Sequence, residues 1–218
     1  MGTPPATADE EMGTFAPEDL NPETRERIEA AVLEVFSATD FHRASIRDVA
    51  KKAGVSFTSI YKYYGSKEGL LFACLDHHLY ALTERLIDHL QGIAHLKEKL
   101  RKVFWVQLDF YERHPDLGRI LFLTVPYKKW MDDKTFKQPK FIDLLMDILR
   151  KGQQEGALNQ GVSTGVLLDF IFGFIHRRFT MWIYRGQKEN LTEDANAAFE
   201  MVWQGISNPF EGQHTANK

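Results

Sequence analysis

The stretch GVSFTSIYKYYGSKEGL, residues 54–70, places three tyrosines and a lysine within four consecutive positions. Tyrosine combines an apolar ring with a hydroxyl, so Tyr61, Tyr63 and Tyr64 suit a surface that is partly packed and partly wet. Lys62 lies among them and adds a positive charge. Hydroxyl and ammonium groups donate hydrogen bonds to phosphate oxygens, so this stretch could hold an anionic partner. The alternative is that the tyrosines are half-buried packing residues and the lysines form a solvated face.

A second group that could do chemistry is Cys74, with His77 and His78 three and four residues further on. A thiol–imidazole pair is possible on one helix, but no orienting group or oxyanion donor accompanies it. The surrounding leucine stripe gives Cys74 an ordinary core neighbourhood. One helix cannot direct His77, His78 and His89 to one metal ion, so solvated histidines explain them. We therefore expect no enzyme, no metal site and no cofactor.

The composition is that of an ordinary globular protein, with 44% apolar and 26% charged residues in a chain of 218. The net charge is −3, so any basic patch must be local. The single cysteine cannot form an internal disulfide, which fits a reducing compartment. Apolar runs fall short of the ~20 residues that a membrane helix needs. We expect a soluble, cytoplasmic protein that does not enter a membrane.

Helices must position these side chains, because apolar residues recur every three or four positions and strand-like alternation is absent. The predicted fold class is all-α. Four helix starts are marked by residues that can cap a helix: Asn21, Ser45, Ser56 and Ser66. Four later ranges are also expected to be helical: 96–113, 140–155, 163–185 and 193–206. A polar loop is expected at 126–139.

Two short helices joined at Gly54 and Val55 suggest a helix-turn-helix that packs on the first helix. Val55 and Ile60 would point inward. The residues left outside are Phe57, Thr58, Tyr61, Lys62 and Tyr63. Residues 24–71 hold eight basic and six acidic side chains, so their net charge is +2, opposite in sign to the whole chain. These features together favour a DNA-reading helix.

Residues 44–71, ASIRDVAKKAGVSFTSIYKYYGSKEGLL, closely resemble the DNA-binding segment of the TetR family of one-component bacterial repressors. The matching features are IRDVAKKAGVS, IYKYY and SKEGLL, in register and without gaps. The resemblance implies a homodimeric, ligand-responsive repressor that binds a near-palindromic operator and is released by a hydrophobic small-molecule effector. The alternative is an all-α ligand-binding or scaffold protein that does not bind DNA.

The resemblance also implies roles for single residues. Phe57, Thr58 and Lys62 would face base edges. Five residues would hold phosphates: Ser45, Ser59, Tyr61, Tyr63 and Lys67. Tyr64 would belong to the core. The chain departs from the usual family pattern at Phe57, Thr58, Ser59 and Tyr64, so the operator sequence cannot be carried over from a relative.

The later helices would bind the effector and form the dimer. The segment 166–184 is apolar nearly all round, which implies burial on two sides, one of them against a second copy. Gly165 and Gly173 would allow backbones to approach. The last helix would add Ala197, Ala198, Met201, Val202 and Trp203. The alternative is a fully internal helix of a monomer.

The aromatic residues of these helices could line an effector pocket or fill a core. The predicted pocket residues are Phe104, Leu108, Phe141, Phe170, Phe174, Arg177 and Arg178. A buried guanidinium needs a partner, because an unpaired charge is costly. The two arginines could pair with interface acids, namely Glu193, Asp194 or Glu200. Alternatively, one of them could bind the acidic group of a fatty acid or acyl thioester.

The predicted organisation has four segments. A disordered acidic tail covers 1–20 and a flexible C-terminal tail covers 209–218. Between them lie a helix-turn-helix domain at 21–68 and an effector-binding and dimerisation domain at 69–208. The long helix at 66–93 would connect both domains and change the spacing of the DNA-reading helices when the effector binds.

Overall fold

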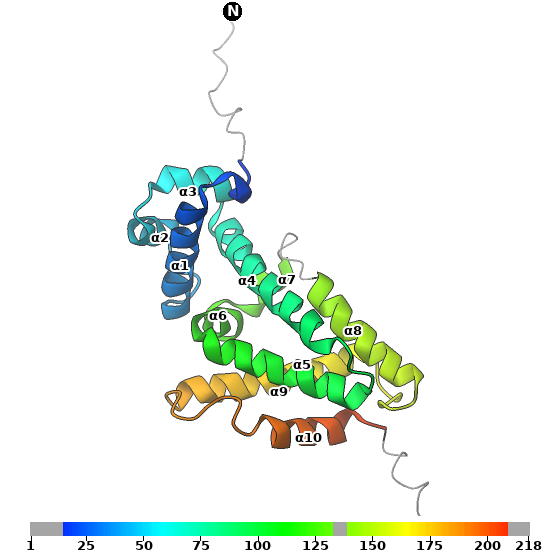
Figure 1. The fold of residues 1–218 in the computed structure, drawn as a ribbon. Coiled ribbons are helices and arrows are strands. Elements are labelled where there is room, and N and C mark those ends of the chain that lie inside the picture. The colour runs from blue at the N-terminus through cyan, green and yellow to red at the C-terminus, as the bar shows by residue number, and fades with distance from the viewer. Residues whose placement is uncertain (1–14, 133–138, 209–218) are drawn as a thin grey trace, which may run out of the picture. The chain divides into compact units, whose positions relative to one another are not determined.

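The computed structural model describes residues 15–132 and 139–208, and within these residues the chain is helical, without β-strands (Figure 1). This confirms the predicted all-α class. The chain divides into two compact units. Unit 1 contains Met1–Asp76 and Thr124–Phe136, and unit 2 contains His77–Leu123 and Lys137–Lys218. None of the described helices is long and apolar enough to cross a membrane.

Unit 1 is built on α1 (Pro22–Ala38), α2 (Ile46–Ala53), α3 (Phe57–Tyr64) and the start of α4 (Lys67–Leu90). All four predicted helix starts are confirmed. The Asn21 side chain accepts hydrogen bonds from the main chain of α1, and Ser45, Ser56 and Ser66 do the same for α2, α3 and α4. Each cap satisfies N–H groups that have no partner inside their own helix.

Two features stabilise the turn between α2 and α3: the conformation of Gly54 and hydrogen bonds from Arg27. Gly54 ends α2 with a φ of 65°, in the left-handed region where a side chain is costly. Arg27 of α1 donates hydrogen bonds to the carbonyl oxygens of Ala53 (2.5 and 3.0 Å) and Gly54 (3.0 Å). A cation therefore meets the negative end of α2 and holds α1 against it.

The core of unit 1 uses the apolar faces predicted from the sequence. Val32 and Phe36 of α1, Val49 of α2 and Ile60 of α3 are all fully buried. Leu70 at the start of α4 is buried as well. Because every helix contributes to one core, the outer face of α3 has a fixed orientation relative to α1 and α2.

Residues 127–132 form α7 (Tyr127–Asp132), so the predicted loop at 126–139 is wrong for this part. The cause is tertiary packing. The ring of Trp130 lies 5.3 Å from that of Phe72, and its Nε1 donates to the carbonyl of Val125 at 3.3 Å. Lys129 also pairs with Glu68 at 2.8 Å. Residues 133–138 of the predicted loop lie outside the described residues.

The segment before α1 contains the short 3₁₀ helix η1 (Pro17–Asp19), and Leu20 after it is buried. Residues 15–20 therefore do not fit the disordered tail predicted for 1–20, because Leu20 packs into the core. Residues 1–14 and the predicted tail at 209–218 lie outside the described residues.

Unit 2 consists of the remainder of α4 with α5 (Leu96–Arg113), α6 (Pro115–Arg119), α8 (Pro139–Gln154), α9 (Thr164–Tyr184) and α10 (Ala195–Ile206). A π-helical segment, η2 (Ile120–Thr124), follows α6. Helix α5 packs against α8, α9 and α10, and α9 also contacts α8 and α10 (Figure 1). His114 ends α5 directly before Pro115, as predicted.

Helix α9 has one buried face and one exposed face. The buried face repeats every fourth residue: Leu167, Ile171, Ile175, Phe179 and Ile183. On the opposite side Val166 and Phe170 are each 49% exposed. The apolar character of α9 therefore has two causes, a core on one side and an uncovered surface on the other.

Candidate DNA-reading face and effector cavity

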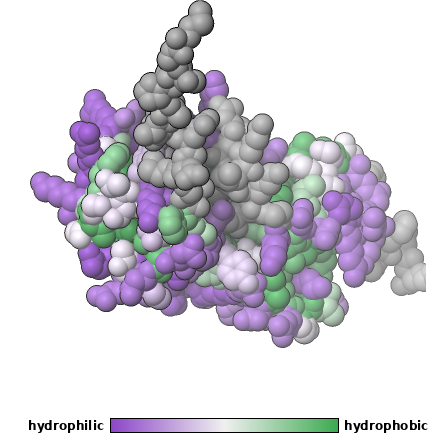
Figure 2. Space-filling view, turned by 90° about the horizontal axis from the view of Figure 1, so that it is seen from above, coloured by the Kyte–Doolittle hydropathy of each residue, from purple (hydrophilic) through white to green (hydrophobic). Residues whose placement is uncertain are grey.

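The outer face of α3 carries exposed aromatic rings. Phe57 and Tyr61 are 42% and 44% exposed, and their rings stack with centroids 5.9 Å apart. The guanidinium of Arg47, on α2, lies 5.7 Å from the Phe57 ring. Thr58 is exposed beside them. The left part of Figure 2, where α2 and α3 lie, shows hydrophobic and neutral residues with hydrophilic residues around them.

Lys62 and Tyr63 contact the segment that precedes α1. The Lys62 ammonium lies 3.7 Å from the centre of the Phe15 ring, and the Phe15 and Tyr63 rings are 5.7 Å apart. A cation over an aromatic ring is attracted to it. In this structure the Phe15 ring therefore covers one side of the Lys62 ammonium.

The two serines predicted to hold phosphates act within the fold here. Ser45 accepts from the N–H of Asp48 at 3.2 Å and donates to its carboxylate at 2.6 Å. The Ser59 hydroxyl lies 2.7 Å from that of Ser56. Both hydroxyls lie at helix starts, where main-chain N–H groups favour an anion.

The ammonium of Lys67, which was predicted to hold a phosphate, binds carbonyl groups of its own chain. Its ammonium donates to the carbonyls of Phe41 (2.7 Å) and Ala44 (3.1 Å), and it lies 4.3 Å from the Phe41 ring. These contacts tie the first turn of α4 to the segment between α1 and α2. An ammonium has three N–H donors, so two are already in use.

Burial disfavours ionisation of Tyr64, which is half-buried, and of Cys74, which is buried. Burial, with a smaller contribution from the Glu29 carboxylate, raises the pKa of Tyr64 to about 12. Burial also raises the pKa of the Cys74 thiol well above its usual range, and the thiol faces the Glu29 carbonyl at 3.8 Å. The thiolate needed for nucleophilic attack is therefore disfavoured. Among the described residues, no cluster of His, Cys, Asp and Glu could hold a metal ion.

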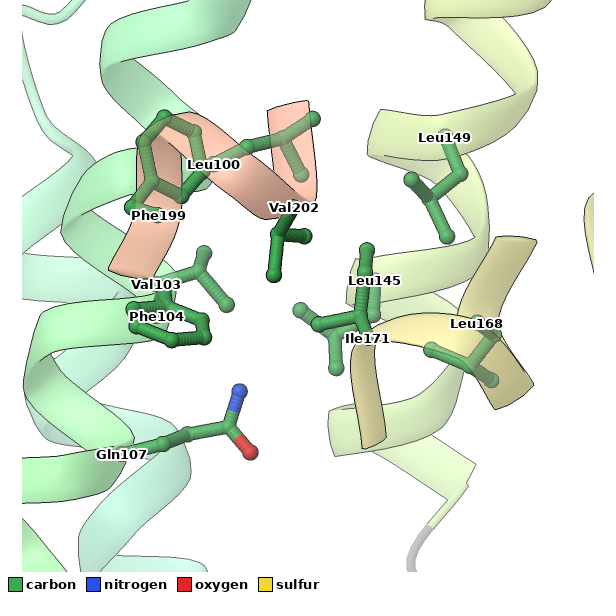
Figure 3. A pocket seen from close by; sticks show the side chains of 10 residues that line it. All are labelled: Leu100, Val103, Phe104, Gln107, Leu145, Leu149, Leu168, Ile171, Phe199 and Val202. Atoms are coloured by element: carbon green, nitrogen blue, oxygen red, sulfur yellow. The ribbon is translucent and has the colours of Figure 1, made fainter. Parts of the chain in front are cut away.

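A small cavity lies inside unit 2, between α5, α8, α9 and α10. Ten side chains line it: Leu100, Val103, Phe104, Gln107, Leu145, Leu149, Leu168, Ile171, Phe199 and Val202 (Figure 3). Its volume is about 10 Å³. That is room for about one water molecule, so the side chains must move apart before a larger ligand can enter.

The structure brings only part of the predicted effector set to this cavity. Phe104 lines it, and the Phe174 ring lies 5.8 Å from Phe104. Leu108 and Phe141 are buried in the core nearby but do not line the cavity. Phe170 is exposed and does not line it either, because it lies on the other face of α9.

The arginines of α9 also lie outside the cavity. Arg177 is exposed, and Arg178 is half-buried with its Nε donating to the carbonyl of Leu191 at 3.1 Å. Arg178 borders a separate surface hollow of about 140 Å³, together with Arg185 and Lys188. Glu200 pairs within the chain with two cations of α5, Lys97 (2.7 Å) and Arg101 (2.6 Å). Lys97 and Arg101 lower the Glu200 pKa, and among the described residues the ion pairs of Glu200 are with these two cations of α5.

Sequence reasoning omitted nine of the ten lining residues from the predicted site. Most are aliphatic, and aliphatic residues look the same in a cavity wall as in any core. Gln107 carried a usable signal, since it is a polar residue on the otherwise apolar face of α5 that includes Val103 and Phe104.

Two family models match the chain. Residues 28–74 match that of bacterial regulatory proteins of the tetR family, and residues 75–205 match that of the C-terminal region of YsiA-like proteins. The chain belongs to the TetR family. The TetR-type DNA-binding model thus covers α2, α3 and most of α1, and the second model covers the cavity.

Relatives of this TetR-family chain match over most of their length. The fatty acid metabolism regulator protein of Bacillus subtilis (strain 168) is 26% identical over 189 residues, 86% of this chain and 97% of that protein. The structure of FadR from Bacillus subtilis in complex with stearoyl-CoA has a TM-score of 0.73 at 25% identity, covering 83% of this chain and 98% of that one. The repressor KstR2 of Mycobacterium tuberculosis (strain ATCC 25618 / H37Rv) is 25% identical over 156 residues, 68% of this chain and 73% of that protein.

These matches confirm the main interpretation of the sequence. This TetR-family protein is a ligand-responsive, DNA-binding transcriptional repressor with a helix-turn-helix domain and a larger helical domain. They do not support the alternative of a scaffold protein without DNA binding. Regulators of this family are dimers, and they are generally not enzymes.

Proposed function

We propose that this repressor is released from its operator by a long-chain acyl thioester that enters unit 2. The observation that carries the proposal is the match along nearly the whole chain to a fatty acid metabolism regulator, together with a similar fold that was solved with stearoyl-CoA. The largely apolar cavity between α5, α8, α9 and α10 supports it, because an acyl chain needs such a lining. The protein would act in the cytoplasm, on DNA, and would catalyse no reaction.

For DNA binding we propose that the exposed residues of α3 read bases while their neighbours hold phosphates. Phe57 and the methyl group of Thr58 could contact thymine methyl groups, and Lys62 could donate to a base edge. Tyr61 and Tyr63 would donate to phosphates, with Ser45 and Ser59 at the starts of α2 and α3. The contacts of Lys67 within unit 1 favour a supporting role for it in holding this face together.

For the dimer we propose that the exposed face of α9 packs on a second copy. Val166, Phe170, Gly173, Arg177 and Tyr184 are all exposed. At 100° per residue they fall within about 60° of one another around the helix axis. Three of these residues, Val166, Phe170 and Tyr184, are large hydrophobic side chains, and their exposure along one stripe marks an interaction surface. Arg177 would then lie at the proposed interface.

Ligand entry offers a mechanism for release. The cavity is nearly closed, so an acyl chain can bind only to a state in which the surrounding helices have moved apart. A ligand that binds only the open state shifts the population toward it. Helix α4 is continuous and includes residues of both units, so it could link this change to the DNA-binding helices. The domain limits at 21–68 and 69–208 remain a prediction.

The proposal is tested by thermal unfolding of the protein with stearoyl-CoA, palmitoyl-CoA, palmitate or coenzyme A. A ligand that binds only the folded state stabilises it by about 2.7 kcal/mol at 100 times its Kd. We expect the two acyl thioesters to raise the melting temperature and coenzyme A alone to leave it unchanged. If no acyl compound raises the melting temperature, the proposed effector class is wrong.

A further inference from the structure

A buried side-chain amide inside unit 2 has an unpaired hydrogen-bond donor. Gln107 lies in the middle of α5 and is 1% exposed. Within the described residues its amide nitrogen Nε2 has no hydrogen-bond partner. A buried donor without an acceptor costs stability, and the great majority of buried polar atoms do have a partner. Its presence therefore calls for a partner that is absent from the free protein.

The surroundings of Gln107 show where that partner would lie. The side chain is part of the cavity wall, and Figure 3 shows its amide directed into the space enclosed by the other lining residues. The other nine lining side chains are all apolar. A trapped water is a poor partner, because it needs two to four polar neighbours and the lining side chains offer one.

We propose that Gln107 is the polar subsite of the effector pocket and donates a hydrogen bond to an oxygen atom of a lipophilic ligand. This rests on the proposed function, since it assumes that the cavity opens to admit an acyl compound. The oxygen has two sources that share this chemistry: the thioester carbonyl, or a hydroxyl or keto group on the chain. A plain hydrocarbon segment beside Gln107 would leave the amide unpaired.

The subsite makes the repressor selective for oxygen at one position. In an apolar enclosure, a ligand that satisfies the amide is favoured over one that buries it without an acceptor. A ligand with an oxygen at this point should bind about tenfold tighter than one of equal length without it. The affinity of the pocket would thus depend on whether the lipophile carries an oxygen at this point as well as on its length.

The test uses four coenzyme A derivatives of equal chain length. S-dodecyl-CoA has no carbonyl, dodecanoyl-CoA has only the thioester carbonyl, and 3-hydroxy- and 12-hydroxydodecanoyl-CoA add a hydroxyl at different depths. Their affinities are measured by calorimetry for the wild type and for Gln107→Leu. Leu100→Met, on the same face of α5, is the control for a change of cavity shape without a change of polarity.

We expect the wild type to bind at least one oxygen-bearing ligand about tenfold more tightly than S-dodecyl-CoA. Gln107→Leu should lose this preference and Leu100→Met should keep it. The ligand that shows the preference identifies the oxygen. Without ligand, Gln107→Leu should melt at or above the wild-type temperature, since it removes an unpaired amide.

Two results would overturn the inference while leaving the proposed function intact: equal binding of all four ligands to the wild type, or a preference that persists in Gln107→Leu. A marked loss of stability in unliganded Gln107→Leu would also count against it, because Gln107 would then have a structural partner. If none of the four ligands, nor any longer acyl thioester, binds the wild type, the proposed function itself fails.

Discussion

The side chains on and around α3 form two groups: some stabilise the fold, and others are exposed on its surface. Ser56 caps α3, and Ile60 is buried in the core. Phe57, Thr58 and Tyr61 are exposed, and we propose that they meet DNA. Lys62 lies between these groups, since it is half-buried and its ammonium contacts the Phe15 ring. This division leads to two predictions.

Base readers and phosphate holders should respond differently to mutation. Lys62→Ala should change which bases are preferred, by about 1–3 kcal/mol at the affected position. Tyr63→Phe removes only a hydroxyl and should weaken binding to all sequences alike. DNA selection followed by sequencing separates the two effects. Lys62 is not a base reader if Lys62→Ala selects the same sequence as the wild type.

The contact between Phe15 and Lys62 should restrain DNA binding. Lys62 must leave the ring before it can reach a base, and an exposed cation–π contact is worth about 0.5–1 kcal/mol. Phe15→Ala should therefore bind operator DNA about two- to fivefold more tightly, as measured by fluorescence anisotropy. In a Lys62→Ala background the same change should have no effect. Weaker DNA binding by Phe15→Ala would instead mean that the ring holds Lys62 in its reading position.

What could be predicted for single residues depended on how local their partners are. The caps at Asn21, Ser45 and Ser56 were predictable, because each bonds main chain within three residues. The contacts of Lys67 were not, since its partners lie 23 and 26 residues away. The apolar ring of Phe170 predicts a place in a pocket, but an apolar ring does not reveal which neighbour covers it.

Among the elements, the junction of α2 and α3 sets the angle at which α3 is presented. Gly54 supplies the left-handed residue, and Arg27 of α1 binds the carbonyls at the end of α2. Helix α7 shows the limit of sequence reasoning at this scale. Its sequence resembles a loop, and its helical form depends on the contacts of Trp130 and Lys129 with the start of α4.

Replacement of Gly54 should destabilise unit 1. A Cβ atom at this position would meet Arg27 Nη2 at 3.1 Å, and the φ of 65° is unfavourable for alanine. Gly54→Ala should lower the free energy of unfolding by about 1–2 kcal/mol, as measured by urea denaturation. Gly54→Asn is the matched control and should cost less, since asparagine tolerates this conformation. Equal stability of Gly54→Ala and the wild type would contradict this account of the turn.

At the scale of the whole molecule, function depends on a second copy. Two DNA-reading helices must reach successive major grooves about 34–36 Å apart, which one chain cannot do. The sequence predicted that α9 has two apolar sides, and the structure shows one of them uncovered in the single chain. The sequence predicts residues that belong to the interface, but not which of them pair across it, because that depends on the geometry of two chains.

A charge in the middle of the exposed α9 face should separate the dimer. A Cβ atom at Gly173 meets nothing within 4 Å in one chain, so a substitution there should not disturb the fold of the monomer. Gly173→Glu should sediment as a monomer and lose operator binding, whereas Gly173→Ser should remain dimeric. A Gly173→Glu monomer that binds its operator with undiminished affinity would contradict the proposed interface.

The most direct test of the whole account is a titration of the repressor–operator complex with stearoyl-CoA, followed by the anisotropy of labelled DNA. The operator would come from DNA selection with the purified protein. The account predicts that the acyl thioester releases the DNA completely and that coenzyme A alone releases none. It is contradicted if the complex persists at stearoyl-CoA concentrations that saturate the protein, as judged by its thermal stabilisation.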